Sequence, residues 1–573
     1  MNTSNILSFV LSGHGFSGAV CVNGQIVVAT TLERLTRKKY DILLPLSQHD
    51  LDTLGWTADP KVYQDAMDVP FDLSAHAIDL SLCEPFHTML DYLLTAASLT
   101  MPDVETVVWS YRHTDAAQRY FARYYPHVQF IGNPEHHATH AAQAFLPSPF
   151  DDAAILVVDG QGIPLARVGG DQLAGCLAYG SRSASITMLE DIPVRHSLGG
   201  MYAAFTTKCG FKTNEDGKTM GLAAYGTPTY YQPVTFDAYE SLRATLSGLR
   251  HGRWPTRLHY QLPRYWELLE KCVRRKSTDP MTSEYQDLAY AAQHMVEEVM
   301  IHLGKYLREY TGSKNLCIAG GVGLNCVANA KVLKACGFEH IYIPSSPGDN
   351  GLVVGQALAL AGKLTTITDR DDWGQSYSKP RVEQAMATTN LPVQSLNVTT
   401  VAQAIANGKV VGWYQGRSEF GPRALGHRSI LADPRKAYMK DYLNASVKFR
   451  EAFRPYTPSC LAEHAHAYFD LSVPSPFMLL APEVHLWKRR EIPAVTHVDG
   501  TARVQTVTPA NGRYYDLITA FHNLTGVPMV LNTSFNVAGE PMVETPEDAV
   551  RCFQSTALDI LVMDEWMVTK HAQ

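Results

Sequence analysis

The feature that most constrains the fold is a strand that enters a short glycine-containing loop and is followed by a return strand, because it occurs twice. The first copy has an apolar strand at 6–11, the loop Ser12-Gly13-His14-Gly15, and further strands at 19–22 and 26–30. The second copy extends over 155–179 and has its own glycine-containing loop. Two similar halves of this kind predict a duplicated α/β domain.

Length and composition indicate an enzyme with more than one domain. A chain of 573 residues is too long for one hydrophobic core, so two domains are the default and three are allowed. Hydrophobic residues make up 46% and charged residues 18%, as in soluble globular enzymes. The net charge of −7 gives no support for a nucleic-acid surface, and no apolar stretch of about 18 residues predicts a membrane span. Ten cysteines without a CxxC pair fit reduced thiols, and we expect a cytoplasmic protein.

A polar segment divides the chain. Thr, Asp, Gly, Ser and Pro cluster there, so we predict a linker at 366–380 between a first domain, 1–365, and a second domain, 381–573. The second domain opens with a helix near 381–388 and continues with a strand at 409–414, which is a further α/β pattern.

Two histidines and an aspartate indicate a metal site in the first domain. His136 and His140 are four residues apart in a segment that reads as helix, so both imidazoles lie on one helix face and can bind one ion. Asp159 ends an apolar strand just before a glycine-rich turn and can offer a third ligand. Asp349 precedes another helix-like run and is either its N-cap or a fourth ligand; spacing alone favours the cap.

Several loops have the composition of anion-binding sites. At 316–325 a strand enters a double-glycine loop that precedes a helix, so backbone N–H groups can face an anion. The segment 416–429 contains three arginines and three glycines, which favours phosphate binding over an exposed basic turn. Lys448, Arg450, Arg454 and Arg503 add positive charge to this half. The segment 531–536 suits hydroxyl or phosphate contacts, and a plain turn is equally compatible.

Two further features have competing interpretations. His14, alone in a glycine loop, either satisfies local backbone groups or acts as general base for a hydroxyl nucleophile, and taken alone the first is favoured. Gly217-Lys218-Thr219 resembles a P-loop fragment, but the upstream glycine spacing is absent, so it is not a Walker motif.

Together these segments resemble the O-carbamoyltransferase family, whose members modify antibiotics, nodulation factors and other natural products. The matching segments occur in family order over nearly the whole chain, and they are 33–39, 136–141, 158–162, 218–224, 320–325, 421–426 and 531–536.

The resemblance implies a fold and a reaction. The first domain would have the actin/sugar-kinase fold, and the smaller second domain would be YrdC-like. In the second domain, carbamoyl phosphate would lose phosphate, and the resulting carbamate would be joined to AMP from ATP. Carbamoyladenylate would then move to the first domain, where a hydroxyl of a small-molecule natural product would attack its carbonyl.

The resemblance also implies the site residues. The metal ligands would be His136, His140, Asp159 and Asp349, which replaces the N-cap interpretation of Asp349. Iron is the usual ion, although manganese and zinc also suit these ligands, and magnesium would accompany ATP. The catalytic residues would be His14, Arg423, Lys448 and Arg503. Nucleotide and phosphate contacts would come from Asp159, Gly160, Gly162, Lys218, Gly320, Gly321, Gly323, Asn325, Arg417, Asn532 and Ser534. One departure concerns the first loop, which reads Gly13-His14-Gly15 where the family commonly has His-Asp-Ala-Ser.

Two alternatives remain at this point. One is a carbamoylation enzyme that acts on tRNA or on a hydrogenase-maturation protein, although the acidic balance and the lack of CxxC pairs disfavour both. The other is a nucleotide-gated binding protein, because the actin-like fold also serves as a switch. We expect a small-molecule acceptor, no nucleic-acid or membrane partner, and a monomer or a homodimer.

Overall fold

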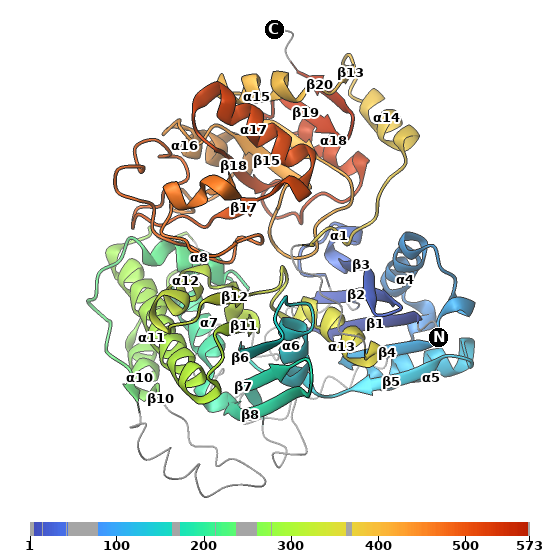
Figure 1. The fold of residues 1–573 in the computed structure, drawn as a ribbon, viewed down its shortest axis with the longest axis vertical. Helices are drawn as coiled ribbons and strands as arrows, with labels where there is room; N and C mark the ends of the chain where they lie inside the picture. The colour runs from blue at the N-terminus through green and yellow to red at the C-terminus, as the bar shows by residue number, and fades with distance from the viewer. Residues whose placement is uncertain are drawn as a thin grey trace, which may run out of the picture.

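The structure is a computed structural model in which a second domain lies across the two lobes of the first (Figure 1). It describes residues 5–13, 15–41, 43, 78–162, 172–212, 214–236, 260–276, 278–362 and 370–570.

The first lobe is built on a five-stranded sheet with the order β3-β2-β1-β4-β5. Strands β1 (Asn5–Ser12), β2 (Gly15–Val22) and β3 (Gln25–Thr31) form an antiparallel meander, and β1 then pairs in parallel with β4 (Thr106–Tyr111), which pairs in parallel with β5 (Gln129–Asn133). The predicted strands at 6–11, 19–22 and 26–30 are confirmed.

The second lobe repeats this topology with the order β12-β11-β6-β7-β8. Here β6 (Asp152–Val158), β7 (Leu173–Ser181) and β8 (Ser185–Pro193) are antiparallel, and β6 pairs in parallel with β11 (Asn315–Ala319), which pairs in parallel with β12 (His340–Tyr342). The shared order and strand directions confirm the predicted duplication and the actin/sugar-kinase-like fold class.

Two helices pack against each other between the sheets. Helix α6 (His136–Phe145) contacts β6, β7 and β11, whereas α13 (Leu352–Ala361) contacts β1, β2 and β3. All residues of α6 except Ala138 are buried, because the helix is covered by a sheet on one side and by α13 on the other. The metal-ligand candidates on α6 therefore lie in the centre of the first domain, next to the carboxyl end of β6.

The remaining helices cover the outer faces of the sheets. In the first lobe α4 packs on β2 and β3, and in the second lobe the long helix α11 packs on α7, α8 and α12. The bounds of the first-domain helices are α1 Leu32–Thr36, α4 Glu84–Ala97, α5 Thr114–Tyr124, α7 Leu198–Lys208, α8 Asp216–Ala223, α10 Pro263–Lys271, α11 Ser283–Thr311 and α12 Cys326–Ala335.

The second domain is a mixed eight-stranded sheet with the order β13-β20-β19-β14-β15-β18-β16-β17. Its strands are β13 Gln394–Ser395, β14 Val411–Tyr414, β15 Arg428–Ala432, β16 Thr457–Leu461, β17 Gln505–Val507, β18 Met529–Ser534, β19 Ile560–Met563 and β20 Trp566–Thr569. Its helices are α14 Lys379–Ala387, α15 Val398–Ala406, α16 Met439–Leu443, α17 Arg513–Thr525 and α18 Pro546–Gln554. The α/β class is confirmed, whereas the YrdC likeness and the boundaries 1–365, 366–380 and 381–573 stay predictions.

Arginines join the two domains at α1. Arg34 donates to the carbonyls of Glu419 and Gly421 at 3.3 and 3.2 Å. Arg37 donates to the carbonyls of Pro541 (2.8 Å) and Met542 (2.5 Å). A charged donor on a carbonyl is a strong hydrogen bond, so α1 fixes the second domain against the first lobe.

The structure also describes the cysteines and the hydropathy of the helices. All ten cysteines are free thiols, and nine are buried. Among the described residues, no helix has both the length and the hydropathy that a membrane crossing requires.

Candidate active site

Four buried side chains converge where α6 meets the end of β6. His136 Nε2 lies 3.0 Å from Asp159 Oδ2 and 3.7 Å from Asp349 Oδ1. His140 Nε2 lies 3.5 and 3.4 Å from the same two oxygens. One ligand atom from each of the four residues lies within 4.8 Å of all the others. The structure thus brings together the four residues that were predicted as metal ligands.

These separations fit one bound cation. With metal–ligand bonds of 2.0–2.2 Å, neighbouring ligands of one ion lie roughly 3–3.6 Å apart. His140 Nε2 is buried and faces both carboxylates, as expected of an atom that serves a metal. Two imidazoles and two carboxylates suit Fe(II), Mn(II) or Zn(II).

Charge complementarity dominates the electrostatics of this cluster. Burial disfavours the imidazolium of His140, but hydrogen bonding and charge from Asp159 and Asp349 outweigh it and raise the pKa of His140 to about 9. Burial opposes ionisation of Asp159 too, yet the two imidazoles hold its pKa well below the usual value. The Asp159 carboxylate therefore stays charged at neutral pH.

Asp349 is not an N-cap. It begins the short 3₁₀ turn Asp349–Gly351, and α13 follows with Gly351 at its N-cap position and no side-chain capping bond. The spacing-based interpretation was therefore wrong, because the position of this side chain is set by the loop that carries it toward α6.

Hydrogen bonds orient the cluster. His140 Nδ1 lies 2.8 Å from Gln143 Oε1, and the Gln143 amide donates to the carbonyls of Ser346 and, at 3.3 Å, Gly348. Gln143 thus couples an imidazole on α6 to the loop that carries Asp349, which is the usual way in which a second layer orients metal ligands. The ring of Tyr111 packs edge-on against His136 at 5.1 Å.

The double-glycine loop after β11 faces the same cluster. Gly321 N–H donates to Asp159 Oδ1 at 2.8 Å. Gly320 has φ +89°, and a Cβ there would lie 2.2 Å from the carbonyl oxygen of Val158, so only glycine fits. Gly320 is thus a packing requirement, and Gly323 packs next to Pro347. Of the four predicted contacts in this loop, Gly321 and Asn325 line the cavity described next.

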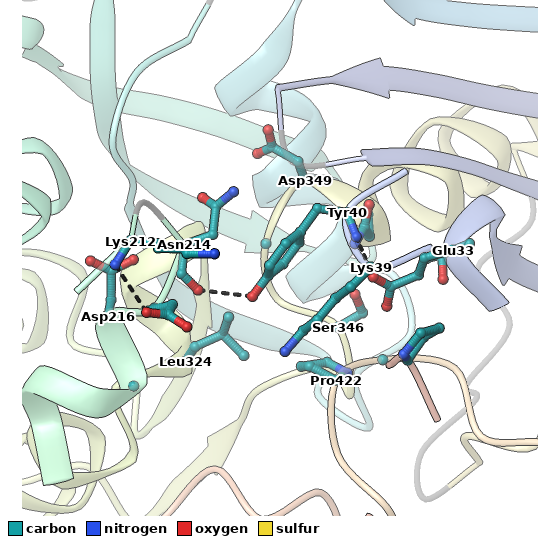
Figure 2. A pocket seen from close by; sticks show the side chains of 18 of the residues that line it. Glu33, Lys39, Tyr40, Lys212, Asn214, Asp216, Leu324, Ser346, Asp349 and Pro422 are labelled. Atoms are coloured by element: carbon teal, nitrogen blue, oxygen red, sulfur yellow. Dashed lines mark hydrogen bonds between the residues drawn. The ribbon is translucent and has the colours of Figure 1, made fainter. Parts of the chain in front are cut away.

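One continuous cavity of about 1910 Å³, called the chamber below, extends from this cluster to the second domain. At the carboxylate end it is lined by Asp159 and Asp349, behind which His136 and His140 lie. At the arginine end it is lined by Arg423, Lys448, Arg450, Arg454 and Arg503. Gly160, Gly162, Lys218 and Ser534 also line it, as their predicted ligand contacts require. Figure 2 shows part of the wall, with Asp349 near one side and Pro422 near the other.

The cations of the arginine end lack counter-charges. Among the described residues, only Arg454 has a carboxylate within ion-pair distance, that of Glu451 at 3.8 Å. Burial and the charge of Arg423 lower the pKa of Arg503 to about 9, and burial also lowers that of Arg423. The Nε atoms of both arginines are buried without a hydrogen-bond acceptor in the described chain. Such a cluster is suited to bind anionic groups.

Lys448 is held differently from the arginines. Its Nζ donates to the carbonyls of Ser534 and Asn536 at 2.7 and 2.9 Å and lies 2.6 Å from Asn536 Oδ1. Burial, with the nearby arginines, lowers its pKa well below the usual value. It ends a π-helical turn, 444–448, a distortion that often marks functional sites.

Two residues that were predicted to contact ligands do not line the chamber. Arg417 does not line the chamber and instead donates to the carbonyls of Gly374 (2.6 Å) and Val27. Asn532 is fully buried, and its amide donates to Ala424 O at 3.1 Å. Both side chains donate to groups of the protein, and their predicted ligand contacts stay predictions. His14 lies outside the described residues, so its role stays a prediction.

Sequence reasoning left several residues in or next to the chamber out of the predicted site. Arg450 and Arg454 were noted only as added charge, although their spacing from Lys448 was a usable signal. Gln143 follows His140 by three residues on the same helix face, which is a second signal. Tyr40 carried no signal, because nothing near it in the sequence indicates what it contacts.

The chain matches known families and relatives over both domains. Residues 109–358 match the family described as Carbamoyltransferase N-terminus, and residues 402–570 match Carbamoyltransferase C-terminus. An uncharacterized protein of Synechocystis sp. is 34% identical over 100% of this chain and 97% of its own length. Nodulation protein NolNO of Sinorhizobium fredii is 35% identical, covering 97% of this chain and 79% of that protein. Nodulation protein NolO of Bradyrhizobium diazoefficiens is 38% identical, covering 76% and 78% respectively.

Proposed function

Because this chain belongs to the carbamoyltransferase family, we propose that it carbamoylates a hydroxyl group of a small molecule through a carbamoyladenylate intermediate. The observation that carries the proposal is the chamber, which joins a cluster of uncompensated cations to a cluster of cation-binding side chains. An enzyme that binds a polyanion at one site and a metal-associated phosphate at another needs a cationic cluster and a metal-binding cluster.

The first steps belong to the arginine end. Carbamoyl phosphate would be hydrolysed to carbamate and phosphate, and a carbamate oxygen would then attack the α-phosphorus of ATP, with pyrophosphate as the leaving group. Arg423 and Arg503 would bind these oxyanions and neutralise the charge that develops as pyrophosphate departs, and Lys448 would hold the segment of Ser534 and Asn536 beside them. Carbamate is unstable in water, so a chamber that holds it next to ATP favours its capture.

The transfer step belongs to the carboxylate end. The acceptor oxygen would form a bond to the carbamoyl carbon, the bond from that carbon to the phosphate oxygen would break, and AMP would leave. When bound, a divalent ion at His136, His140, Asp159 and Asp349 would supply positive charge for the adenylate phosphate. The loop amides near Gly321 would orient the cluster, and His14 would take the proton of the acceptor hydroxyl.

Carbamoyl-phosphate-dependent exchange of labelled pyrophosphate into ATP tests the adenylation step. We expect exchange in the wild-type protein, its loss in Arg423→Ala, and its retention in the control Arg490→Ala, whose arginine is exposed and outside the chamber. Exchange at the normal rate in Arg423→Ala would contradict the assignment of the arginine end.

Mass spectrometry of products tests the transfer step and the alternatives. A carbamoyl mass added to a small molecule supports the proposal, and His14→Ala should abolish it while exchange continues. Carbamoylation of tRNA or of a protein, or nucleotide turnover without acylation, would instead support the alternatives considered from the sequence.

A further inference from the structure

An exposed aromatic ring lines the arginine end of the chamber. Phe449 lies between Lys448 and Arg450 in the chain, and all three residues line the chamber. Phe449 is 60% exposed, and within the described ranges it belongs to none of the four apolar cores. A single exposed apolar side chain needs no explanation on an outer surface, but in a ligand cavity it offers a flat apolar face to whatever binds there.

The backbone holds this ring in a conformation that phenylalanine rarely adopts. Phe449 has φ +46° and ψ +55°, in the left-handed region where a bulky side chain is an outlier. Its N–H donates to the carbonyl of Asn444 and so closes the π-helical turn 444–448. Glycine would adopt the same conformation without the steric cost. A strained aromatic residue at the wall of a substrate cavity is a reason to look for a function of its ring.

Anchored side chains on both sides fix the position of Phe449. On one side, Lys448 is held by the hydrogen bonds of its Nζ described above. On the other side, Arg450 Nε donates to Asn444 Oδ1 at 3.0 Å. The guanidinium carbon of Arg450 also lies 4.3 Å from the centre of the Tyr456 ring. The ring is therefore presented by a fixed segment, so little conformational entropy is lost when a ligand packs against it.

The ligand that suits this wall combines a flat ring with several oxyanions. Phe449 supplies a π face, and Arg423 and Arg503 in the same chamber have buried donors without acceptors in the described chain. Of the reactants of the proposed adenylation, carbamoyl phosphate has charge but no ring, and ATP has both. We propose that Phe449 stacks on the adenine base of ATP while the arginine end holds its phosphates. The inference rests on the proposed use of ATP and adds to it a substrate-binding residue; because every base has a π face, this residue supplies affinity rather than base selectivity.

Inorganic tripolyphosphate separates the base from the phosphates, because it has a chain of three phosphates like that of ATP but no ring. We expect Phe449→Ala to raise the Kd of ATP, measured with magnesium by titration calorimetry, at least fivefold, while the Kd of tripolyphosphate changes less than twofold. Arg503→Met should weaken the binding of both ligands, since both use the phosphate contacts. An unchanged Kd of ATP in Phe449→Ala, or parallel weakening of both ligands in this variant, would overturn the proposal.

Two further variants test whether the effect belongs to this ring. Phe449→Trp should keep the Kd of ATP within twofold of the wild-type value, because indole also offers a stacking face. Tyr438→Ala is the matched control, because Tyr438 is 57% exposed, immediately precedes α16 and does not line the chamber. A loss of ATP affinity in Tyr438→Ala equal to that in Phe449→Ala would overturn the assignment.

Phe449→Gly separates the role of the ring from folding. Because glycine relieves the left-handed strain, the thermal midpoint of the ligand-free variant should stay at or above that of the wild type, while the Kd of ATP rises as in Phe449→Ala. A lowered midpoint would overturn the proposal, since the ring would then support the fold. Absence of pyrophosphate exchange in a wild-type protein whose ATP binding depends on Phe449 would overturn the proposed adenylation alone, whereas absence of ATP binding in the wild type would overturn both.

Discussion

The two ends of the chamber use charge in opposite ways. At the carboxylate end, Asp159 and Asp349 face His136 and His140 at 3.0–3.7 Å, so each charge has a partner within the protein. At the arginine end, Arg423 and Arg503 have buried donors without acceptors in the described chain.

This difference indicates how the ligands differ. Paired acids and imidazoles form a site whose shape is set in advance and whose centre is small enough for one ion. Buried cations without counter-charges lower the stability of the folded protein. Anions that bind to them raise that stability again. The first end is therefore suited to a resident cation, and the second to substrates that come and go.

We expect the largest effect from a substitution that removes a charge at the carboxylate end, where the charges are paired. In Asp159→Asn we expect metal content, measured by mass spectrometry after equilibration with iron, manganese or zinc, to fall below about a tenth of the wild-type value. Asp152→Asn, at the start of the strand that precedes Asp159 and outside the cluster, should keep the ion. Normal metal content in Asp159→Asn would remove the basis for calling this end a cation site.

We expect the next largest effect from a substitution that removes a charge at the arginine end. Arg503→Met should lower pyrophosphate exchange by about 10²–10³-fold, because one donor to the developing charge is lost. The same change should raise the thermal midpoint of the ligand-free protein, since it relieves repulsion with Arg423. Arg490→Met should change neither quantity, and a lowered midpoint in Arg503→Met would contradict the contrast between the ends.

A moderate effect is expected one layer behind the paired end. Gln143→Leu should weaken metal affinity by about 10–100-fold, because His140 and the loop of Asp349 lose their shared hydrogen-bonding partner. A titration with a competing chelator measures this, and Gln403→Leu, at an exposed position of α15, is the matched control. Equal affinity in both variants would show that the ligands need no such support.

The smallest effect concerns a charge pair away from the carboxylate end. Despite the cost of burial, Asp371 raises the pKa of His427 from 6.5 to about 9, with 3.6 Å between His427 Nε2 and Asp371 Oδ1. A raised pKa in the folded state means that this stabilisation is complete below pH 6.5 and is lost as the pH rises through about 9. Urea unfolding between pH 6.5 and 9 should show a loss of unfolding free energy in the wild type and a smaller loss in Asp371→Asn. An identical dependence of this free energy on pH in both proteins would rule out the pair as a source of stability.

The sequence predicted the fold class and the paired end because both depend on local patterns. The alternation of strands and loops marked the two lobes, and helical spacing brought His136 and His140 together. Asp349 could be assigned only through the family resemblance, since a cap and a ligand look alike until the direction of the side chain is known.

The rest depended on partners that are distant in the sequence. Tyr40 meets Asn214 across 174 positions, and Gln143 meets Ser346 across 203, which no local pattern encodes. Arg417 and Asn532 have the same chemistry as the residues that line the chamber, but they donate to other groups of the protein, among them the carbonyls of Gly374 and Ala424. Residue type therefore indicated which side chains can bind an anion. Only tertiary packing decided whether their donors are already paired within the protein.

The size of the chamber has a quantitative consequence. One molecule confined to 1910 Å³ is present at a concentration of about 0.9 M, far above what a labile metabolite reaches in bulk water. A nucleophile held in the same space would meet its electrophile at that effective molarity, even if only one copy were made per turnover.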